Sequence, residues 1–449
     1  MRPMTDPART ATLLLTLALS ACGSPASATP STLGTSNLDL DELSRAAVSD
    51  DDARAEASIA TLRARGRAGF EALRTTHAEH IARLRDTPPT TPSAADARLR
   101  HALDRVAKQR DAHASGLYWH TDFEAALAES RATGKPLLSL RLLGKLDEEL
   151  SCANSRYFRT VLYANEAVSA ALAAGYVLHW SSERPAPRMT IDFGDGRTIE
   201  RTFTGNSIHY LIDADGRVID ALPGLSTPSD FLAELGAARA AFTRCSGLAT
   251  DAADACYASA HRQAREQTAA AWTALRAQTP SLPALETFGG APTPRDAVEV
   301  PDAISARLAM RQTVGKMIIE MPALNAVQPV AAPVPAVAPE SVDWSALVPP
   351  GAAANALDAR TRALIALKSG GRGDAIGPAL ARAATMDAVR NRFAMHDRLR
   401  GWLLADGPRP RLTDFNTRVY TELFLTPASD PWLGLRAPDV WDAIEDVSR

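Results

Sequence analysis

The chain has 449 residues, of which 46% are hydrophobic and 22% charged, with 49 Lys and Arg against 52 Asp and Glu. At roughly 150 residues per domain, this length allows two or three folded units. The formal net charge of −3 argues against a nucleic-acid-binding protein, because such proteins usually carry an excess of basic residues. No apolar run reaches the roughly 18 residues that a transmembrane helix needs.

The N-terminus contains a short apolar run, residues 11–19, that leads into Leu-Ser-Ala-Cys at residues 19–22. Such a run ending in small residues is typical of a secretory signal peptide. These last four residues resemble the lipobox of bacterial lipoproteins, a family in which the cysteine is lipidated and becomes the new N-terminus. The resemblance implies a signal peptide over 1–22 and lipidation at Cys22. An ordinary cleaved signal with an incidental cysteine is the alternative.

The residues after Cys22 indicate where such an anchor would lie. No aspartate follows this cysteine, so the resemblance implies an outer-membrane lipoprotein that faces the periplasm. Residues 23–38, rich in Ser, Thr, Pro and Ala, predict a flexible tether. Residues 39–112 show helical periodicity, and Ser93 is expected to cap a helix that begins at Ala94.

The remaining cysteines are expected to lie in an oxidising compartment. Cys245 and Cys256 are eleven residues apart, with a Ser-Gly break between them. This spacing predicts a disulfide that closes a turn between two helices, with two buried thiols as the alternative. Cys152 is then the odd thiol, and a thiol left unpaired in such a compartment needs a functional reason.

Residues 116–243 predict an α/β domain. A helix is expected over 123–132, a strand over 137–143, a helix from Ser151 to about 174 and a strand over 176–180. Two hairpins are predicted next, over 189–203 and 208–222, and Thr227 is expected to cap a last helix that ends near Phe242. This order of elements is that of the thioredoxin fold, a mixed sheet with helices on both faces.

Several residues of this region resemble those of thioredoxin-fold proteins. Trp119, Asp122 and the Gly-Lys-Pro turn at 134–136 look like the lead-in to the first strand of that family. The resemblance places Cys152 on the nucleophilic cysteine and Ser155 on the resolving one. It also places Ser207 at the cis-proline position, which contacts the substrate. The chain as a whole looks like a group of bacterial thioredoxin-fold proteins with a Cys-x-x-Ser motif.

The motif suggests a particular chemistry. A cysteine at the start of a helix favours the thiolate, which attacks disulfides and forms a mixed disulfide. Ser155 cannot resolve that intermediate, so the sequence predicts monothiol exchange or isomerisation with Cys152 acting on periplasmic protein thiols or disulfides. A redox-inactive scaffold that binds a periplasmic partner protein is the alternative. A Cys-His hydrolase would require His179 or His209 beside Cys152.

The rest of the chain is expected to be mainly helical. A helical extension is predicted over 244–321 and a Pro-rich linker over 322–350. The C-terminal helical region, 351–449, is expected to contain four helices, at about 358–368, 374–384, 387–404 and 414–424. No pattern indicates a metal site or an organic cofactor, and none is expected.

Overall fold

The structure is a computed structural model that describes residues 40–89, 91–202, 205–282, 284–285, 344–348, 357–405, 407–431 and 433. The predicted signal peptide, the predicted lipidation site Cys22 and the predicted tether lie outside these residues. Most of the predicted Pro-rich linker lies outside them as well.

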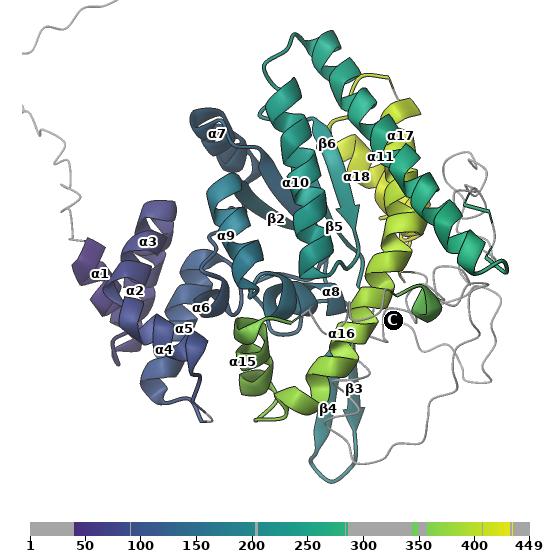
Figure 1. Ribbon diagram of the computed structural model, residues 1–449. Helices are drawn as coiled ribbons and strands as arrows, with labels where there is room; N and C mark the ends of the chain where they lie inside the picture. The colour runs from purple at the N-terminus through teal and green to yellow at the C-terminus, as the bar shows by residue number, and fades with distance from the viewer. Residues whose placement is uncertain are drawn as a thin grey trace, which may run out of the picture. The chain divides into compact units, whose positions relative to one another are not determined.

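A mixed four-stranded sheet forms the centre of the α/β region (Figure 1). Its strands are β1 (Leu137–Leu143), β2 (Val177–Arg184), β5 (Ser207–Ile212) and β6 (Val218–Pro223). They are ordered β2-β1-β5-β6; β1 and β2 are parallel, and β5 is antiparallel to both of its neighbours. Every residue of β5 and β6 is buried, so both faces of these strands are covered.

Successive residues of β5 show what covers each face, because neighbouring side chains of a strand point to opposite faces. The ring of His209 contacts Phe158, which lies before β2 in the chain, and Phe231, which lies after β6. The ring of Tyr210 contacts Phe415 instead. One face is therefore covered by helices of the α/β region and the other by a helix from the C-terminal part of the chain.

Four helices of the α/β region accompany the sheet: α7 (Phe123–Thr133), α8 (Ala153–Tyr157), α9 (Glu166–Gly175) and α10 (Pro228–Cys245). The single helix expected from Ser151 to about 174 is in fact α8, a π-helix η1 (Phe158–Leu162) and α9. The run breaks because Asn165 leaves the helical conformation and caps α9, its side chain accepting a hydrogen bond from the Val168 amide.

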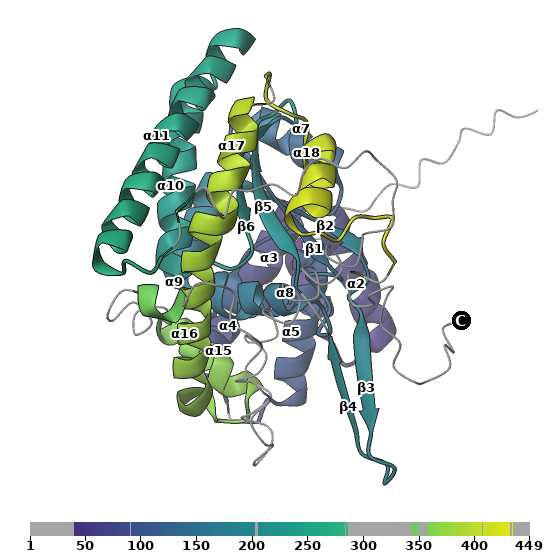
Figure 2. The ribbon, with the colours of Figure 1, turned by 90° about the vertical axis from the view of Figure 1, so that its right-hand side faces the viewer.

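The first predicted hairpin forms a separate two-stranded sheet, β3 (Arg188–Asp192) and β4 (Thr198–Thr202). Its turn contains Gly194 and Gly196, both with positive φ, which glycine adopts without steric cost. Figure 2 shows the hairpin extending away from the four-stranded sheet. Most of its side chains are exposed.

The N-terminal helical region has its own hydrophobic core, which includes Leu62, Phe70 and Leu103. Ser93 caps α5 as predicted, in a capping box with Asp96. The helices of this region are α1 (Leu40–Ala46), α2 (Asp52–Ala64), α3 (Arg67–Thr76), α4 (Ala78–Asp86), α5 (Ala94–Ala107) and α6 (Ala112–Ser115).

The C-terminal helices pack into the same hydrophobic core as the sheet, with Trp402, Phe415 and Tyr420 among its members. The helices predicted over 374–384 and 387–404 are one continuous helical run from 373 to 405, because no glycine or proline interrupts residues 384–387. A short 3-10 helix, η2 (Trp344–Leu347), lies within the predicted linker. The elements after the linker are α15 (Ala359–Lys368), α16 (Gly373–Arg390), η4 (Asn391–His396), α17 (Asp397–Ala405), α18 (Leu412–Arg418) and η5 (Val419–Leu423).

The longest described helix is α11 (Thr250–Gln278), which follows α10 after a short turn. It buries Tyr257, His261 and Trp272 while most of its other side chains are exposed or half-buried, which is the pattern of an amphipathic helix. None of the helices in the described ranges is both long and apolar enough to cross a membrane.

Candidate functional site

Cys152 lies at the start of α8, where the sequence places it. It is the N-cap residue of this helix, and its sulfur accepts a hydrogen bond from the Ser155 amide over 3.4 Å. It forms no disulfide. The thiol-exchange hypothesis requires an accessible sulfur, yet Cys152 and Ser155 both have 0% of their surface exposed. The motif is therefore correctly placed for a thiolate but closed to a substrate in this conformation.

Three segments pack around the motif. The Thr202 hydroxyl, at the end of the β3–β4 hairpin, donates to the Ser151 carbonyl over 2.9 Å. The Tyr420 hydroxyl, from η5, donates to the Asn206 carbonyl over 3.3 Å. Burial raises the pKa of Tyr420 well above its usual value, and the Cys152 thiol is among the nearby groups that add to this shift. Residues more than 250 positions later in the chain thus help to cover the motif.

Ser207 begins β5 and lies beside the motif. The Asn154 side-chain amide donates to the Ser207 hydroxyl over 2.7 Å and to the Gly205 carbonyl over 2.8 Å. The structure therefore brings together Cys152, Ser155 and Ser207, the three residues that the thioredoxin-fold resemblance assigns to one site. Asn154, which the sequence analysis did not single out, makes the connection.

The polar groups around the sulfur are incompletely satisfied. The Ser151 hydroxyl, the Asn154 carbonyl oxygen and the Ser155 hydroxyl are buried and have no hydrogen-bond partner among the described residues. Buried polar atoms without partners are uncommon in folded proteins and often indicate ordered water or a functional site. The motif is therefore a cluster of polar groups inside the core, and its surroundings are not purely apolar.

The two strand histidines do not form a catalytic pair with Cys152. His209 Nε2 shares a hydrogen bond with the Tyr163 hydroxyl over 2.6 Å, and His179 Nδ1 shares one with the Ser139 hydroxyl over 2.8 Å. Burial lowers the pKa of each imidazole to about 3, so both rings are neutral near pH 7. They are satisfied core histidines, and the geometry gives the hydrolase alternative no support.

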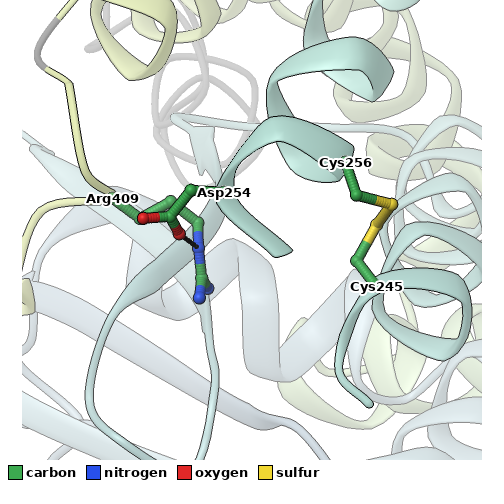
Figure 3. The surroundings of a disulfide bond; sticks show 4 residues. All are labelled: Cys245, Asp254, Cys256 and Arg409. Atoms are coloured by element: carbon green, nitrogen blue, oxygen red, sulfur yellow. Dashed lines mark hydrogen bonds and ion pairs between the residues drawn. A yellow bond between two sulfur atoms is a disulfide. The ribbon is translucent and has the colours of Figure 1, made fainter. Parts of the chain in front are cut away.

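Cys245 and Cys256 form a disulfide that joins the last residue of α10 to the first turns of α11 (Figure 3). Close to it, the Arg409 guanidinium pairs with Asp254 on α11 over 2.7 Å. A loop between α17 and α18 is therefore held to the same helix that the disulfide fixes.

A second buried cluster consists of Asp220, Glu234 and His396, which place one potential metal-ligand atom each within 4.8 Å of one another. These residues come from β6, α10 and η4. Arg400 on α17 donates to both carboxylates, at 3.3 Å from Asp220 and 2.6 Å from Glu234. Because this guanidinium already pairs with both carboxylates, the cluster is better explained as an ionic core than as a metal site.

No sequence signal could have revealed this cluster, because Asp220 and Arg400 are 180 residues apart in the chain.

Comparisons with protein-family models, with curated proteins and with solved structures found no match to the chain. Its function must therefore be inferred from the geometry described above.

Proposed function

We propose that this chain is a lipid-anchored protein of the bacterial envelope, with a thioredoxin-like domain that serves as a redox-inactive scaffold for a periplasmic partner protein. The order of elements supports the thioredoxin-like assignment: α7, β1, the α8–α9 helices, β2, the β5–β6 hairpin and α10. The lipobox-like residues that end in Cys22 support the anchor, and the cysteine pair Cys245–Cys256 suits an oxidising compartment.

The burial of Cys152 is the observation that carries the redox-inactive assignment. Exchange requires the thiolate to approach a substrate sulfur directly. In this conformation no part of the Cys152 side chain reaches the surface, and the hydrogen bonds of Thr202 and Asn154 hold the hairpin and residue 205 against the motif. A thiol enclosed in this way stays reduced because oxidants and disulfides cannot reach it.

The β3–β4 hairpin is the surface that suits partner binding best. Met189, Ile191 and Phe193 alternate along one side of it, and Ile199 lies opposite Ile191 on the same face. Ile191 is 40% and Phe193 48% exposed, and only one other large hydrophobic side chain of the described residues is exposed. An apolar ribbon with unpaired strand edges can bind a partner protein by strand addition and apolar contact.

Thiol labelling tests the assignment. In a Cys22→Ala variant, native Cys152 is expected to resist a maleimide reagent and to react fully once the protein is denatured. Rapid labelling of the native protein, with a thiol pKa clearly below about 8.5, would contradict the redox-inactive proposal.

Crosslinking in cells tests partner binding. Ile191→Asp and Phe193→Asp are expected to abolish a crosslinked complex that Cys152→Ala retains. Loss of the complex in Cys152→Ala would instead assign the interaction to the thiol.

Monothiol exchange by Cys152 is the second candidate, favoured by the Ser155 amide bond to the sulfur and by the unpartnered polar atoms around it. It requires the cover formed by Tyr420 to move. A mixed disulfide trapped in cells on Cys152, and lost in Cys152→Ala, would support this candidate over the scaffold.

A further inference from the structure

A pocket of about 650 Å³ lies beside the turn between β5 and β6, on the side where the disulfide joins α10 to α11. Its walls come from four separate parts of the chain: the end of α7, the β5–β6 turn, the α10–α11 junction and residues 409–411. The last segment is fixed there because the Val218 amide donates to the Pro410 carbonyl over 2.9 Å. Only the folded chain brings these parts together.

The pocket is strongly basic, although the whole chain has a net charge of −3. Its two acidic lining residues are Asp213 and Asp215. Its five basic lining residues are Arg131, Lys135, Arg217, Arg409 and Arg411. A concave surface with such an excess of one charge concentrates ligands of the opposite charge.

The basic residues divide into two groups, those with partners and those without. Arg217 belongs to the first group, because its guanidinium donates to the Arg409 carbonyl over 2.8 Å. Arg409 is already paired with Asp213 and Asp254, each over 2.7 Å. In contrast, Arg131, Lys135 and Arg411 make no ion pair or side-chain hydrogen bond with any residue that the structure describes. Three cations in the wall are therefore available to an anion.

Tyr257 supplies an independent indication of a ligand. Its side chain is 1% exposed and lines the pocket, but its hydroxyl has no hydrogen-bond partner among the described residues. The Arg409 guanidinium lies over its ring, 4.4 Å from the centroid, and fixes it in place. Burial raises the pKa of Tyr257 to about 12, so the hydroxyl is a donor at neutral pH.

The remaining lining is apolar and includes Phe242, Leu248 and Ala253. The N-cap residue of α11, Ala249, offers no side-chain cap, so backbone N–H groups of the first turn also lack a side-chain acceptor. A ligand with an anionic group and an apolar part can therefore contact both the basic and the apolar residues of the pocket.

We propose that this pocket binds a small organic anion through its phosphate or carboxylate group. The anionic group accepts a hydrogen bond from the Tyr257 hydroxyl and is balanced by Lys135, Arg131 and Arg411. The apolar part of the ligand rests on Phe242 and Leu248. This binding site is independent of Cys152 and of the β3–β4 hairpin.

Calorimetric titration of the full chain with phenyl phosphate and with benzoate tests the proposal and separates the two anion classes. We expect saturable one-to-one binding of at least one of them and none of the neutral analogue benzyl alcohol. Failure of both anions to saturate, or binding of benzyl alcohol with equal affinity, would overturn the proposal.

Variants place the binding in this pocket. Tyr257→Phe removes only the unpartnered hydroxyl and Arg411→Gln only one charge, and each is expected to weaken anion binding roughly five- to tenfold. Arg83→Gln on α4 makes the same charge change on an exposed residue of the N-terminal helices and is expected to change nothing. Equal weakening in Arg83→Gln, or unaltered affinity in both pocket variants while their thermal unfolding matches the wild type, would refute the site.

Discussion

The side-chain amide of Asn154 donates a hydrogen bond to the Ser207 hydroxyl over 2.7 Å, and so ties the helix of the Cys-x-x-Ser motif to the first residue of β5. A second bond from the same amide reaches the Gly205 carbonyl over 2.8 Å. These bonds hold the predicted site residues together. They also help to close the approach to the sulfur of Cys152.

Replacing Asn154 should therefore open the motif. Asn154→Ala is expected to lower the free energy of unfolding by about 1–3 kcal/mol, because two buried hydrogen bonds are lost. It should also speed maleimide labelling of native Cys152 in the Cys22→Ala background.

A matched control distinguishes local opening from general instability. Asn165→Ala removes the cap of α9 and is expected to cost about 1 kcal/mol without faster labelling. If both variants label equally fast at equal loss of stability, protection of Cys152 depends on global unfolding and not on the Asn154 bonds.

The Asp220–Arg400 pair should be important for docking of the C-terminal helices onto the sheet. Arg400→Met leaves both Asp220 and Glu234 without their guanidinium partner, and a loss of about 3–5 kcal/mol of unfolding free energy is expected in urea denaturation. Replacing both Asp220 and Arg400 by apolar residues should cost less than the sum of the single changes. Simple additivity in this double-mutant cycle would show that the two groups do not interact.

The same pair predicts a stability loss in acid. Burial would raise the pKa of Asp220, but Arg400 and His396 outweigh it and hold the pKa well below its usual value. A lowered pKa contributes stability that is present above the unfolded value of about 3.9 and is lost as the pH falls towards the folded value. Between pH 4 and 2, unfolding free energy should fall less steeply in Asp220→Asn than in the wild type.

Buried histidines predict a second pH effect, at higher pH. Burial lowers the pKa of His179 and His209 to about 3 and that of His113 to about 4. In the unfolded chain these histidines bind protons near pH 6.5. The stability that their neutral, buried forms contribute is therefore complete above that pH and is lost as the pH falls towards 4. Each histidine contributes a slope of about 1.4 kcal/mol per pH unit.

Urea denaturation between pH 7 and 4 measures this slope. His209→Gln keeps an acceptor for the Tyr163 hydroxyl but does not titrate. It should therefore reduce the slope by the contribution of one histidine, about 1.4 kcal/mol per pH unit. An identical slope in the wild type and His209→Gln would mean that His209 is not buried in its neutral form.

The disulfide should stabilise the α10–α11 junction. Replacing Cys245 and Cys256 together by Ser is expected to lower the unfolding free energy by about 3 kcal/mol, the loop-closure contribution for a separation of eleven residues. Dithiothreitol should lower the thermal midpoint of the wild type but not of the double variant. A midpoint of the wild type that reductant does not change would argue against this bond.

Much of the local structure could be predicted from the sequence. Ser93 and Thr227 cap helices where expected, each through its own side chain. The alternating residues 137–143 form β1 with the predicted bounds, and Gly134 ends α7 with a positive φ. These features depend on neighbours within a few residues, and such short-range preferences can be read directly from the order of residues.

The errors occurred where distant contacts decide the outcome. The helix predicted from Ser151 to 174 is broken in two, and the helices predicted over 374–384 and 387–404 are continuous. Tyr420, from the C-terminal helices, lies near the buried Cys152, and the basic pocket needs residues as far apart as Arg131 and Arg411. Contacts between such distant segments cannot be predicted from the pattern of neighbouring residues.

The sequence by itself predicted most of the strands and helix caps and the position of Cys152 at a helix start, and it favoured a disulfide between the other two cysteines of the folded region. Only the tertiary structure decided that the C-terminal helices cover the sheet, that the thiol is enclosed and that scattered arginines line one pocket. The physical reason is that capping and alternation act along the chain, whereas burial and electrostatic fields arise from segments that meet only after folding.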